Sequence, residues 1–356
     1  MDPTIQIVKE WEETAARTGA DPGLTLVLGA SDTGKTSFAR YLMQTWRGRD
    51  LTVACVDGDI GQSTLGPPTT IGMSIYPPQV DPLAVTLSFV GHTSPHGHLI
   101  PLLLGLHRMV ERAKRTGVTA ILVDTTGLVH GEWGRELKFA KIDLLTPRHL
   151  VVLARGGEME AVLQCCALRE GLTLHRLPVA PQAMVKSREE RRAYRQRRLQ
   201  EYFREAALKR FPLDEVKMMG TWLGSGRRLP PADLSFASKQ LNAPVVYGEC
   251  GQGEVNLLAT AEYASEGLFR LRTHLGVREV QVLGVEELTG VILGLNNGTN
   301  ETLALGLLQE LDYREKSLIV LTPLRDVSNV RLLKWGALRI DPNGKELGRY
   351  PPIRSP

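Results

Sequence analysis

The sequence has few cysteines, and their positions exclude two classes of protein. The four are Cys55, Cys165, Cys166 and Cys250, among 356 residues. None belongs to a C-x-x-C pair, and the adjacent pair at 165–166 suits neither a disulfide framework nor a zinc site. The pattern predicts reduced cysteines in the core of a cytoplasmic protein.

Long apolar runs are lacking as well. The stretch 99–106 is too short to cross a membrane, and His107 and Arg108 follow it directly. The opening residues, Met1-Asp2-Pro3-Thr4, form neither the basic nor the apolar part of a secretory signal. We therefore expect no membrane partner.

A strong excess of charge of one sign is also absent, because the net charge is only +4. Apolar residues make up 42% and charged residues 23%, the balance of an ordinary globular protein. Bulk charge therefore identifies no partner, and the length predicts two domains.

The first of these domains is expected at residues 23–212. Short apolar runs alternate there with longer mixed segments, and the runs lie at 24–28, 51–56, 120–123, 150–153 and 174–179. Continuous apolar strands separated by helices predict an α/β domain, with a parallel sheet covered by helices on both faces. A helix at 3–18, capped by Asp2 with Pro3 in its first turn, is expected within the N-terminal segment 1–22.

The second domain is expected at residues 216–356, where glycine and β-forming residues are frequent. Hairpin signals occur at 296–298 and at 343–344. Strands are expected at 290–295, 302–311 and 317–321. The pattern predicts a mostly β domain.

A phosphate-binding loop stands at residues 29–36. The letters GASDTGKT match G-x-x-x-x-G-K-[ST] at every fixed position, with an apolar strand before them and a helix after them. Backbone N–H groups of such a loop point at phosphate oxygens, and the helix N-terminus adds positive charge. Lys35 is expected at the β- and γ-phosphates and Thr36 at Mg²⁺. Nucleotide contacts are expected from Gly29, Ser31, Asp32, Thr33, Gly34, Lys35, Thr36 and Ser37.

Acidic residues follow two of the predicted strands. The letters DGDIGQ at 57–62 come after the second strand, and Asp124 ends the strand at 120–123. Ligands of open parallel sheets lie at the carboxyl ends of strands. Asp57 and Asp124 are therefore candidate Mg²⁺ ligands, a carboxylate of the 57–62 motif is a candidate general base, and Gln62 is a candidate substrate contact.

The letters DTTG at 124–127 also fit the D-x-x-G motif of GTPases, whose glycine backbone senses the γ-phosphate. A guanine-reading N-K-x-D or T-K-x-D motif is missing from the sequence. A GTPase therefore stays an alternative, as does a scaffold that binds nucleotide without turnover.

A basic segment at 186–198 carries seven arginines and lysines against two glutamates. On a helix, four of its arginines fall on one face, and like charges so placed repel one another unless anions lie nearby. Phosphates of a nucleotide or a nucleic acid would supply these anions. The four arginines are Arg188, Arg191, Arg192 and Arg195.

Together these motifs resemble the polynucleotide 5′-hydroxyl kinase family. It includes RNA kinases of eukaryotic RNA 3′-end formation, tRNA splicing and ribosomal-RNA processing, and their archaeal relatives. The resemblance covers the chain from about Gly23 to Ile340. It implies a P-loop NTPase fold of the archaeal type and transfer of the γ-phosphate of ATP, or of GTP or another nucleoside triphosphate, to a 5′-hydroxyl end. RNA and DNA, single-stranded or duplex, stay open as substrates.

The resemblance also implies roles for single residues. Asp59, rather than Asp57, falls on the essential acidic residue and is expected to be the base. The lid motif R-x-x-x-R matches 191–195, within a lid segment 186–204. The match implies that Arg191 and Arg195 are catalytic. Arg188 and Arg192 form an overlapping alternative pair, which is expected at the substrate. Further substrate contacts are expected from Thr93 in the segment 91–95 and from a clasp made of Thr125, Thr126 and Gly127. Some members have tryptophan in the clasp, where this chain has Leu128.

Overall fold

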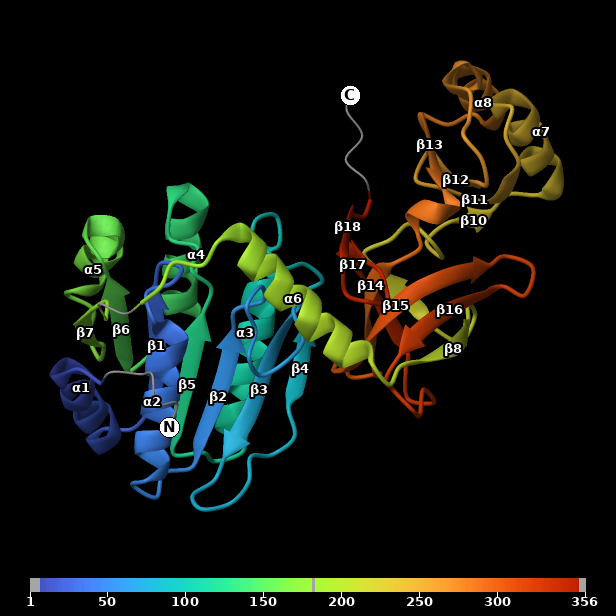
Figure 1. Ribbon diagram of the computed structural model, residues 1–356. Coiled ribbons are helices and arrows are strands. Elements are labelled where there is room, and N and C mark those ends of the chain that lie inside the picture. The colour runs from blue at the N-terminus through green and yellow to red at the C-terminus, as the bar shows by residue number, and fades with distance from the viewer. Residues whose placement is uncertain (1–6, 181–182, 352–356) are drawn as a thin grey trace. The chain divides into compact units, whose positions relative to one another are not determined.

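The structure, a computed structural model, describes residues 7–180 and 183–351. The chain divides after Arg198 into two compact units (Figure 1). The elements of the first unit are α1 (Lys9–Ala20), β1 (Leu24–Gly29), α2 (Lys35–Arg47), β2 (Val53–Gly58), β3 (Thr70–Tyr76), β4 (Thr86–Phe89), α3 (Leu99–Arg115), β5 (Ala120–Thr125), α4 (Gly131–Leu145), β6 (His149–Ala154), α5 (Glu160–Cys166), β7 (Thr173–Pro178) and α6 (Arg188–Phe203), whose last turn belongs to the second unit.

The sheet of the first unit has the order β4-β3-β2-β5-β1-β6-β7. Strands β2, β5, β1, β6 and β7 are parallel, and Asp57 lies directly beside Asp124 in the register of β2 and β5. Because successive side chains of a strand point to opposite faces, β1 buries Leu24, Leu26 and Leu28 on one face and Val27 on the other.

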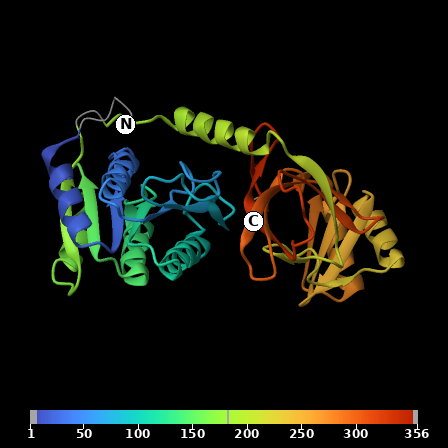
Figure 2. The ribbon, with the colours of Figure 1, turned by 90° about the horizontal axis from the view of Figure 1, so that it is seen from below.

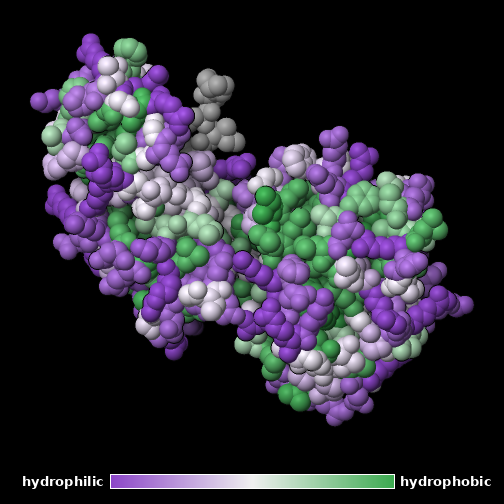
Figure 3. Space-filling model, turned by 180° about the vertical axis from the view of Figure 1, so that it is seen from behind, coloured by the Kyte–Doolittle hydropathy of each residue, from purple (hydrophilic) through white to green (hydrophobic). Residues whose placement is uncertain are grey.

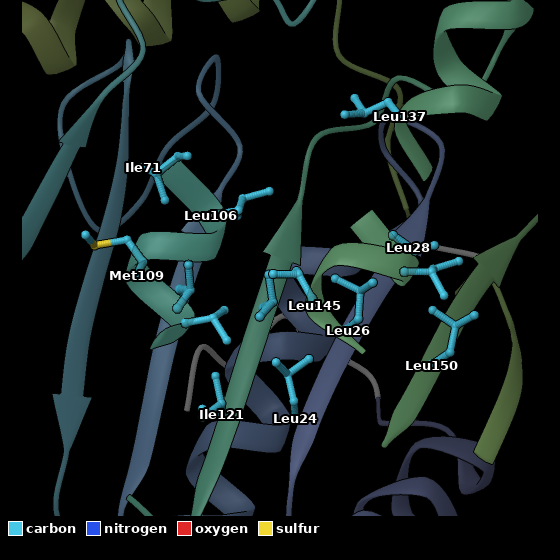
Figure 4. Close-up of a cluster of buried hydrophobic side chains, with 14 of the residues drawn as sticks. Leu24, Leu26, Leu28, Ile71, Leu106, Met109, Ile121, Leu137, Leu145 and Leu150 are labelled. Atoms are coloured by element: carbon cyan, nitrogen blue, oxygen red, sulfur yellow. The ribbon is translucent and has the colours of Figure 1, made fainter. Parts of the chain in front are cut away.

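Helices cover both faces of this sheet, as expected (Figure 2). Helices α1 and α2 pack on one face through a core that contains Trp11, Phe38 and Trp46. Helices α3, α4 and α5 pack on the other, where Leu106 and Met109 lie near Ile71, and Leu137 and Leu145 belong to the same buried cluster as the leucines of β1 (Figure 4). The predicted α/β P-loop architecture is confirmed.

Two features of this unit differ from the expectation. The sheet is not purely parallel, because β3 and β4 add an antiparallel edge beside β2. The N-terminal helix begins at Lys9 and ends at Ala20, where Asp21-Pro22-Gly23 breaks it. The expected cap at Asp2 and Pro3 lies outside the described residues.

The second unit is built mainly of strands, as expected. Its elements are β8 (Ala207–Pro212), β9 (Lys217–Met219), β10 (Arg227–Arg228), α7 (Pro231–Leu241), β11 (Val245–Gly251), β12 (Glu254–Ala259), α8 (Leu268–Leu275), β13 (Glu279–Gly284), β14 (Val291–Asn296), β15 (Thr302–Asp312), β16 (Ser317–Thr322), β17 (Leu332–Ile340) and β18 (Glu346–Arg349).

Both predicted hairpins are present in this unit. Antiparallel β14 and β15 join through 297–301, and antiparallel β17 and β18 join through a turn in which Gly344 has a φ of 78°. Strand β8 pairs with β16, so residues 207–212 lie in the second unit although we expected them in the first. A separate sheet, β10-β11-β12-β13, carries α7 and α8, which the sequence pattern did not predict.

Hydrophilic residues cover most of the surface in Figure 3, and hydrophobic residues gather in smaller patches between them. Across residues 7–180 and 183–351, none of the helices has the length and apolar character needed to cross a membrane. All four cysteines lie in the described ranges and are free thiols, but Cys165 is exposed, so the expectation that all four belong to the core is wrong for this residue.

Candidate active site

The phosphate-binding loop follows β1 and leads into α2, as the motif predicts. Asp32 and Gly34 have φ values of 59° and 85°, so the chain turns through left-handed conformations that bring backbone N–H groups to the inside of the loop. Gly34 is the last residue before α2, whose N-terminus therefore points at the loop. The geometry is that of an anion-binding site.

Lys35 is buried inside this loop. Its Nζ donates a hydrogen bond of 2.6 Å to the Ala30 carbonyl. Burial lowers the pKa of Lys35, and the nearby carboxylates of Asp124, Asp59 and Asp32 act in the opposite direction. One positive charge thus stands among three acidic side chains, at the place where the motif puts the β- and γ-phosphates.

Thr36 and Asp124 meet where α2 begins and β5 ends. The Thr36 hydroxyl donates to Asp124 Oδ2 at 2.6 Å. Burial and the neighbouring Asp57 carboxylate raise the pKa of Asp124 to about 6, and Lys35 opposes the rise. A hydroxyl and a carboxylate at a phosphate-binding loop are the oxygen donors that Mg²⁺ takes alongside nucleotide oxygens and water. The described residues hold no cluster of three or more His, Cys, Asp or Glu that suits a metal ion, so the nucleotide would have to supply further ligands.

Asp57 organises the loop that follows β2. Its Oδ1 accepts a hydrogen bond from the Asp59 backbone N–H, and its Oδ2 accepts from Ser63, from Leu65 and twice from Thr64. Burial raises the pKa of Asp57, and the hydrogen bond from the Thr64 backbone opposes the rise. The Asp57 carboxylate thus accepts five hydrogen bonds from its own loop. Its role as a metal ligand stays a prediction.

Asp59 stands in the same loop and is only partly buried. Its Oδ1 accepts hydrogen bonds from the backbone of Gly61 at 3.1 Å and of Gln62 at 3.0 Å, which fix the orientation of the carboxylate. Gly61 packs on the Thr93 carbonyl, because a methyl group on Gly61 would lie 2.7 Å from that oxygen. The loop with Asp59 and Gln62 therefore lies against the segment that contains Thr93.

The lid segment forms the helix α6 and docks on both motifs. Arg191 Nη2 donates to Asp32 Oδ2 of the phosphate-binding loop at 2.5 Å. Gln62 Nε2 donates to the Arg191 carbonyl at 3.2 Å, and Tyr194 Oη donates to the Ser63 carbonyl at 2.8 Å. The structure thus brings Arg191 to the nucleotide loop and to the acidic loop at once.

The other arginines of α6 differ in exposure. Arg188 and Arg192 are exposed and Arg195 is partly buried. Arg198 donates to the Gly66 carbonyl at 3.2 Å, so it fastens the helix to the loop after Asp57. Two contacts that the sequence did not indicate, those of Tyr194 and Arg198, therefore hold the lid.

The clasp residues have different surroundings. The Thr125 hydroxyl donates to the Val27 carbonyl at 2.8 Å inside the sheet. Gly127 packs directly on the phosphate-binding loop, since a methyl group there would lie 2.3 Å from Ser31 Oγ. The Thr126 carbonyl accepts a hydrogen bond of 2.6 Å from Lys138 Nζ. Thr126 and Gly127 border the loop, whereas Thr125 is turned toward β1.

Sequence reasoning missed two lysines of α4. Lys138 and Lys141 are fully buried on the same side of the helix as Leu137, Ile142 and Leu145. Burial lowers the pKa of both ammonium groups, that of Lys141 to about 7 and that of Lys138 well below its ordinary value, while Asp59 and Asp124 oppose the shift. The signal was available, because both lysines share the spacing of the apolar residues around them.

Comparisons with known proteins find relatives that match this chain over most of its length. A family model described as "mRNA cleavage and polyadenylation factor CLP1 P-loop" matches residues 29–205. The polyribonucleotide 5′-hydroxyl-kinase of Pyrococcus abyssi is 30% identical over 92% of this chain and 90% of its own length. That of Methanocaldococcus jannaschii is 26% identical over 91% and 88%. The solved Clp1p–Pcf11p complex contains a chain with the same fold, with a TM-score of 0.60 at 12% identity, over 93% of this chain and 79% of that one.

Proposed function

Because this chain belongs to the family of P-loop polyribonucleotide 5′-hydroxyl-kinases, we propose that it transfers the γ-phosphate of ATP to the 5′-hydroxyl end of RNA. The proposal rests on one observation above all. Through Arg191, helix α6 contacts Asp32 of the phosphate-binding loop and Gln62 of the acidic loop. A donor site for triphosphate and a carboxylate for an attacking hydroxyl are thereby held together.

The reaction needs few chemical steps from the protein. The 5′-hydroxyl oxygen of the RNA bonds to the γ-phosphorus, the bond from that phosphorus to the β–γ bridging oxygen breaks, and ADP leaves. The hydroxyl proton passes to the Asp59 carboxylate, which Gly61 and Gln62 hold in place. Lys35 and the lid arginines Arg191 and Arg195 stabilise the charge that gathers on the transferring group.

Mg²⁺, when bound, would neutralise charge on the β- and γ-phosphate oxygens. We assign its protein ligands to Thr36 and Asp124, whose oxygens already meet at 2.6 Å. Asp57 we assign to the loop instead, because its five hydrogen bonds shape the turn that presents Asp59. The remaining residues of the phosphate-binding loop hold the triphosphate through their backbone N–H groups.

The RNA end would lie between the clasp and the lid. Thr126 and Gly127 border the nucleotide loop, and Gln62 and Thr93 border Asp59. The exposed Arg188 and Arg192 would contact backbone phosphates. A cytoplasmic location belongs to the same proposal.

A transfer assay with γ-labelled nucleotide tests the proposal. ATP and GTP are each offered with a 5′-hydroxyl RNA, with a DNA of the same sequence, and without an oligonucleotide. Label on the RNA supports the kinase. Hydrolysis of GTP without an oligonucleotide would replace it by a GTPase, and binding without turnover would replace it by a nucleotide-dependent scaffold.

A further inference from the structure

Two buried lysines stand behind the clasp, and no step of the proposed reaction uses them. Lys138 and Lys141 are both fully buried on α4, among apolar neighbours of the core. Burying an ammonium group costs several kcal/mol unless hydrogen bonds and opposite charges offset the loss of water. A core built for stability alone would have methionine or leucine at both positions.

Only one of these lysines has a hydrogen-bond partner among the described residues. Lys138 Nζ donates to the Thr126 carbonyl at 2.6 Å. Lys141 Nζ and the Thr126 hydroxyl are buried and lack a partner within residues 7–180 and 183–351. Buried polar groups of native proteins are nearly always paired, so unpaired ones indicate an acceptor that the protein chain does not itself provide.

The hydrogen bond from Lys138 also fixes the direction of a peptide group. In a trans peptide the carbonyl and the following N–H point in opposite directions. Because the Thr126 carbonyl is held toward Lys138, the N–H of Gly127 points away from it, and Gly127 lies against Ser31 of the phosphate-binding loop. Lys138 thus controls how the clasp backbone faces the nucleotide site.

We propose that Lys138 and Lys141 are positioning residues for phosphoryl transfer. Lys138 holds the Thr126–Gly127 peptide so that its N–H donates to the transferring phosphoryl group, and the unpaired Lys141 Nζ, on the same buried face of α4, offers a further donor to the acceptor that the bound substrates bring. This inference rests on the proposed kinase function. It explains why a protein core retains two lysine side chains.

The test compares turnover with stability. In Lys138→Met the side chain keeps its length but loses its charge and its donor. We expect kcat for RNA phosphorylation to fall by about 10- to 100-fold, as for loss of one donor to a transition state. KM for ATP should stay within about twofold, and the melting temperature should stay the same or rise, because a buried charge is removed.

Two further variants test the hydrogen bond of Lys138 and the contribution of Lys141 separately. Lys138→Gln keeps an N–H donor for the Thr126 carbonyl and should recover most of the lost kcat. Lys141→Met removes the unpaired Nζ of the second lysine and should lower kcat by about tenfold. Leu145→Met, a volume-conserving change on the same buried face, is the control and should change neither kcat nor the melting temperature appreciably.

Several outcomes would overturn the inference. One is wild-type turnover in Lys138→Met or Lys141→Met, and another is a Lys138→Gln variant as slow as Lys138→Met. A lower melting temperature with normal turnover of the folded fraction would make the lysines structural. If Lys138→Met does not fold, the turnover of Lys141→Met tests the inference, and wild-type turnover in that variant would overturn it. Failure of the wild-type protein to label RNA would instead reject the proposed function itself.

Discussion

The two ends of the parallel sheet in the first unit both bury titratable side chains, but in different ways. At the carboxyl ends of the strands, Lys35, Asp57 and Asp124 are buried as groups of opposite charge. At the amino ends, His149 and His175 are buried with ring nitrogens 3.2 Å apart, and His149 Nε2 lies 2.7 Å from the Asp21 carbonyl. Burial and His149 lower the pKa of His175 to about 4, so His175 is neutral near pH 7.

We infer from this difference that the groups at the carboxyl ends serve catalysis and that those at the amino ends serve stability. Charged groups held close together are useful where a charged substrate arrives, whereas two buried imidazoles in contact across β6 and β7 contribute to the packing of the sheet. Variants of Lys35 and Asp59 at the carboxyl end should therefore reduce transfer with little loss of stability, whereas Asp57 also holds its own loop. Variants at the amino end should do the reverse.

The largest effect is expected for Lys35→Ala. It removes the positive charge at the γ-phosphate, and transfer to RNA should fall by at least about 10³-fold. The melting temperature should change little. His175→Gln is the matched control from the other end of the sheet and should label RNA at the wild-type rate. Substantial transfer by Lys35→Ala would show that the nucleotide reacts elsewhere.

Next in size is the contrast between the two aspartates after β2. Asp59→Asn keeps the fold but cannot take the hydroxyl proton, so kcat should fall by about 10²- to 10⁴-fold. Asp57→Asn puts an amide among five donors, and the free energy of unfolding should fall by about 2 kcal/mol. Chemical denaturation measures the free energy of unfolding of both variants, and transfer of labelled phosphate to RNA measures their kcat. If Asp57→Asn is as stable as the wild type, the carboxylate does not hold the loop.

A smaller loss is expected for Arg195→Ala. An arginine at the γ-phosphate acts mainly in the transition state, so kcat should fall by about 10- to 10³-fold with KM for RNA nearly unchanged. Arg197→Ala, an exposed neighbour, should instead raise KM and reduce the salt slope of RNA binding by about one. Measuring kcat and KM of both variants over a range of salt concentrations distinguishes a role in turnover from a role in RNA binding. If Arg195→Ala changes only KM and salt slope, α6 is a nucleic-acid clamp.

The smallest effect concerns pH and the amino end of the sheet. The folded pKa of His175 is about 4 and the ordinary value is 6.5, so only the unfolded chain binds this proton between those values. The contribution of His175 to stability should be complete above about pH 6.5 and should be lost progressively as the pH drops toward 4. Denaturant unfolding of the wild type and His175→Gln measures the difference. Equal pH slopes in the two proteins would remove His175 from the explanation.

Much of this architecture follows from local pattern. The strands β1, β2, β5, β6 and β7 were predicted because buried parallel strands are continuous apolar runs. The edge strands β3 and β4 were missed because Gly72 and Ser74 interrupt the apolar pattern of the first, and the second has four residues. Helices α7 and α8 were missed because glycine and β-forming residues dominate their surroundings in the sequence.

The residues of the site that belong to sequence motifs were predicted, but their partners in the folded chain were not. The sequence placed Lys35, Thr36, Asp124 and the lid arginines in one site, but it did not indicate that Asp32 is the partner of Arg191. Residues 159 positions apart become neighbours only through the packing of the fold. The buried lysines were missed because lysine is rarely buried, so composition alone places it at the surface.

The contact between Gly127 and Ser31 has a consequence for the precision of the reaction. No side chain separates the two backbones, since even a methyl group would lie 2.5 Å from the Ser31 nitrogen. Any residue with a Cβ at 127 would therefore push the clasp and the phosphate-binding loop apart. A displacement of about 1 Å at a reacting centre can cost 100-fold in rate. The missing side chain at position 127 is thus what lets the two segments pack closely at the proposed site.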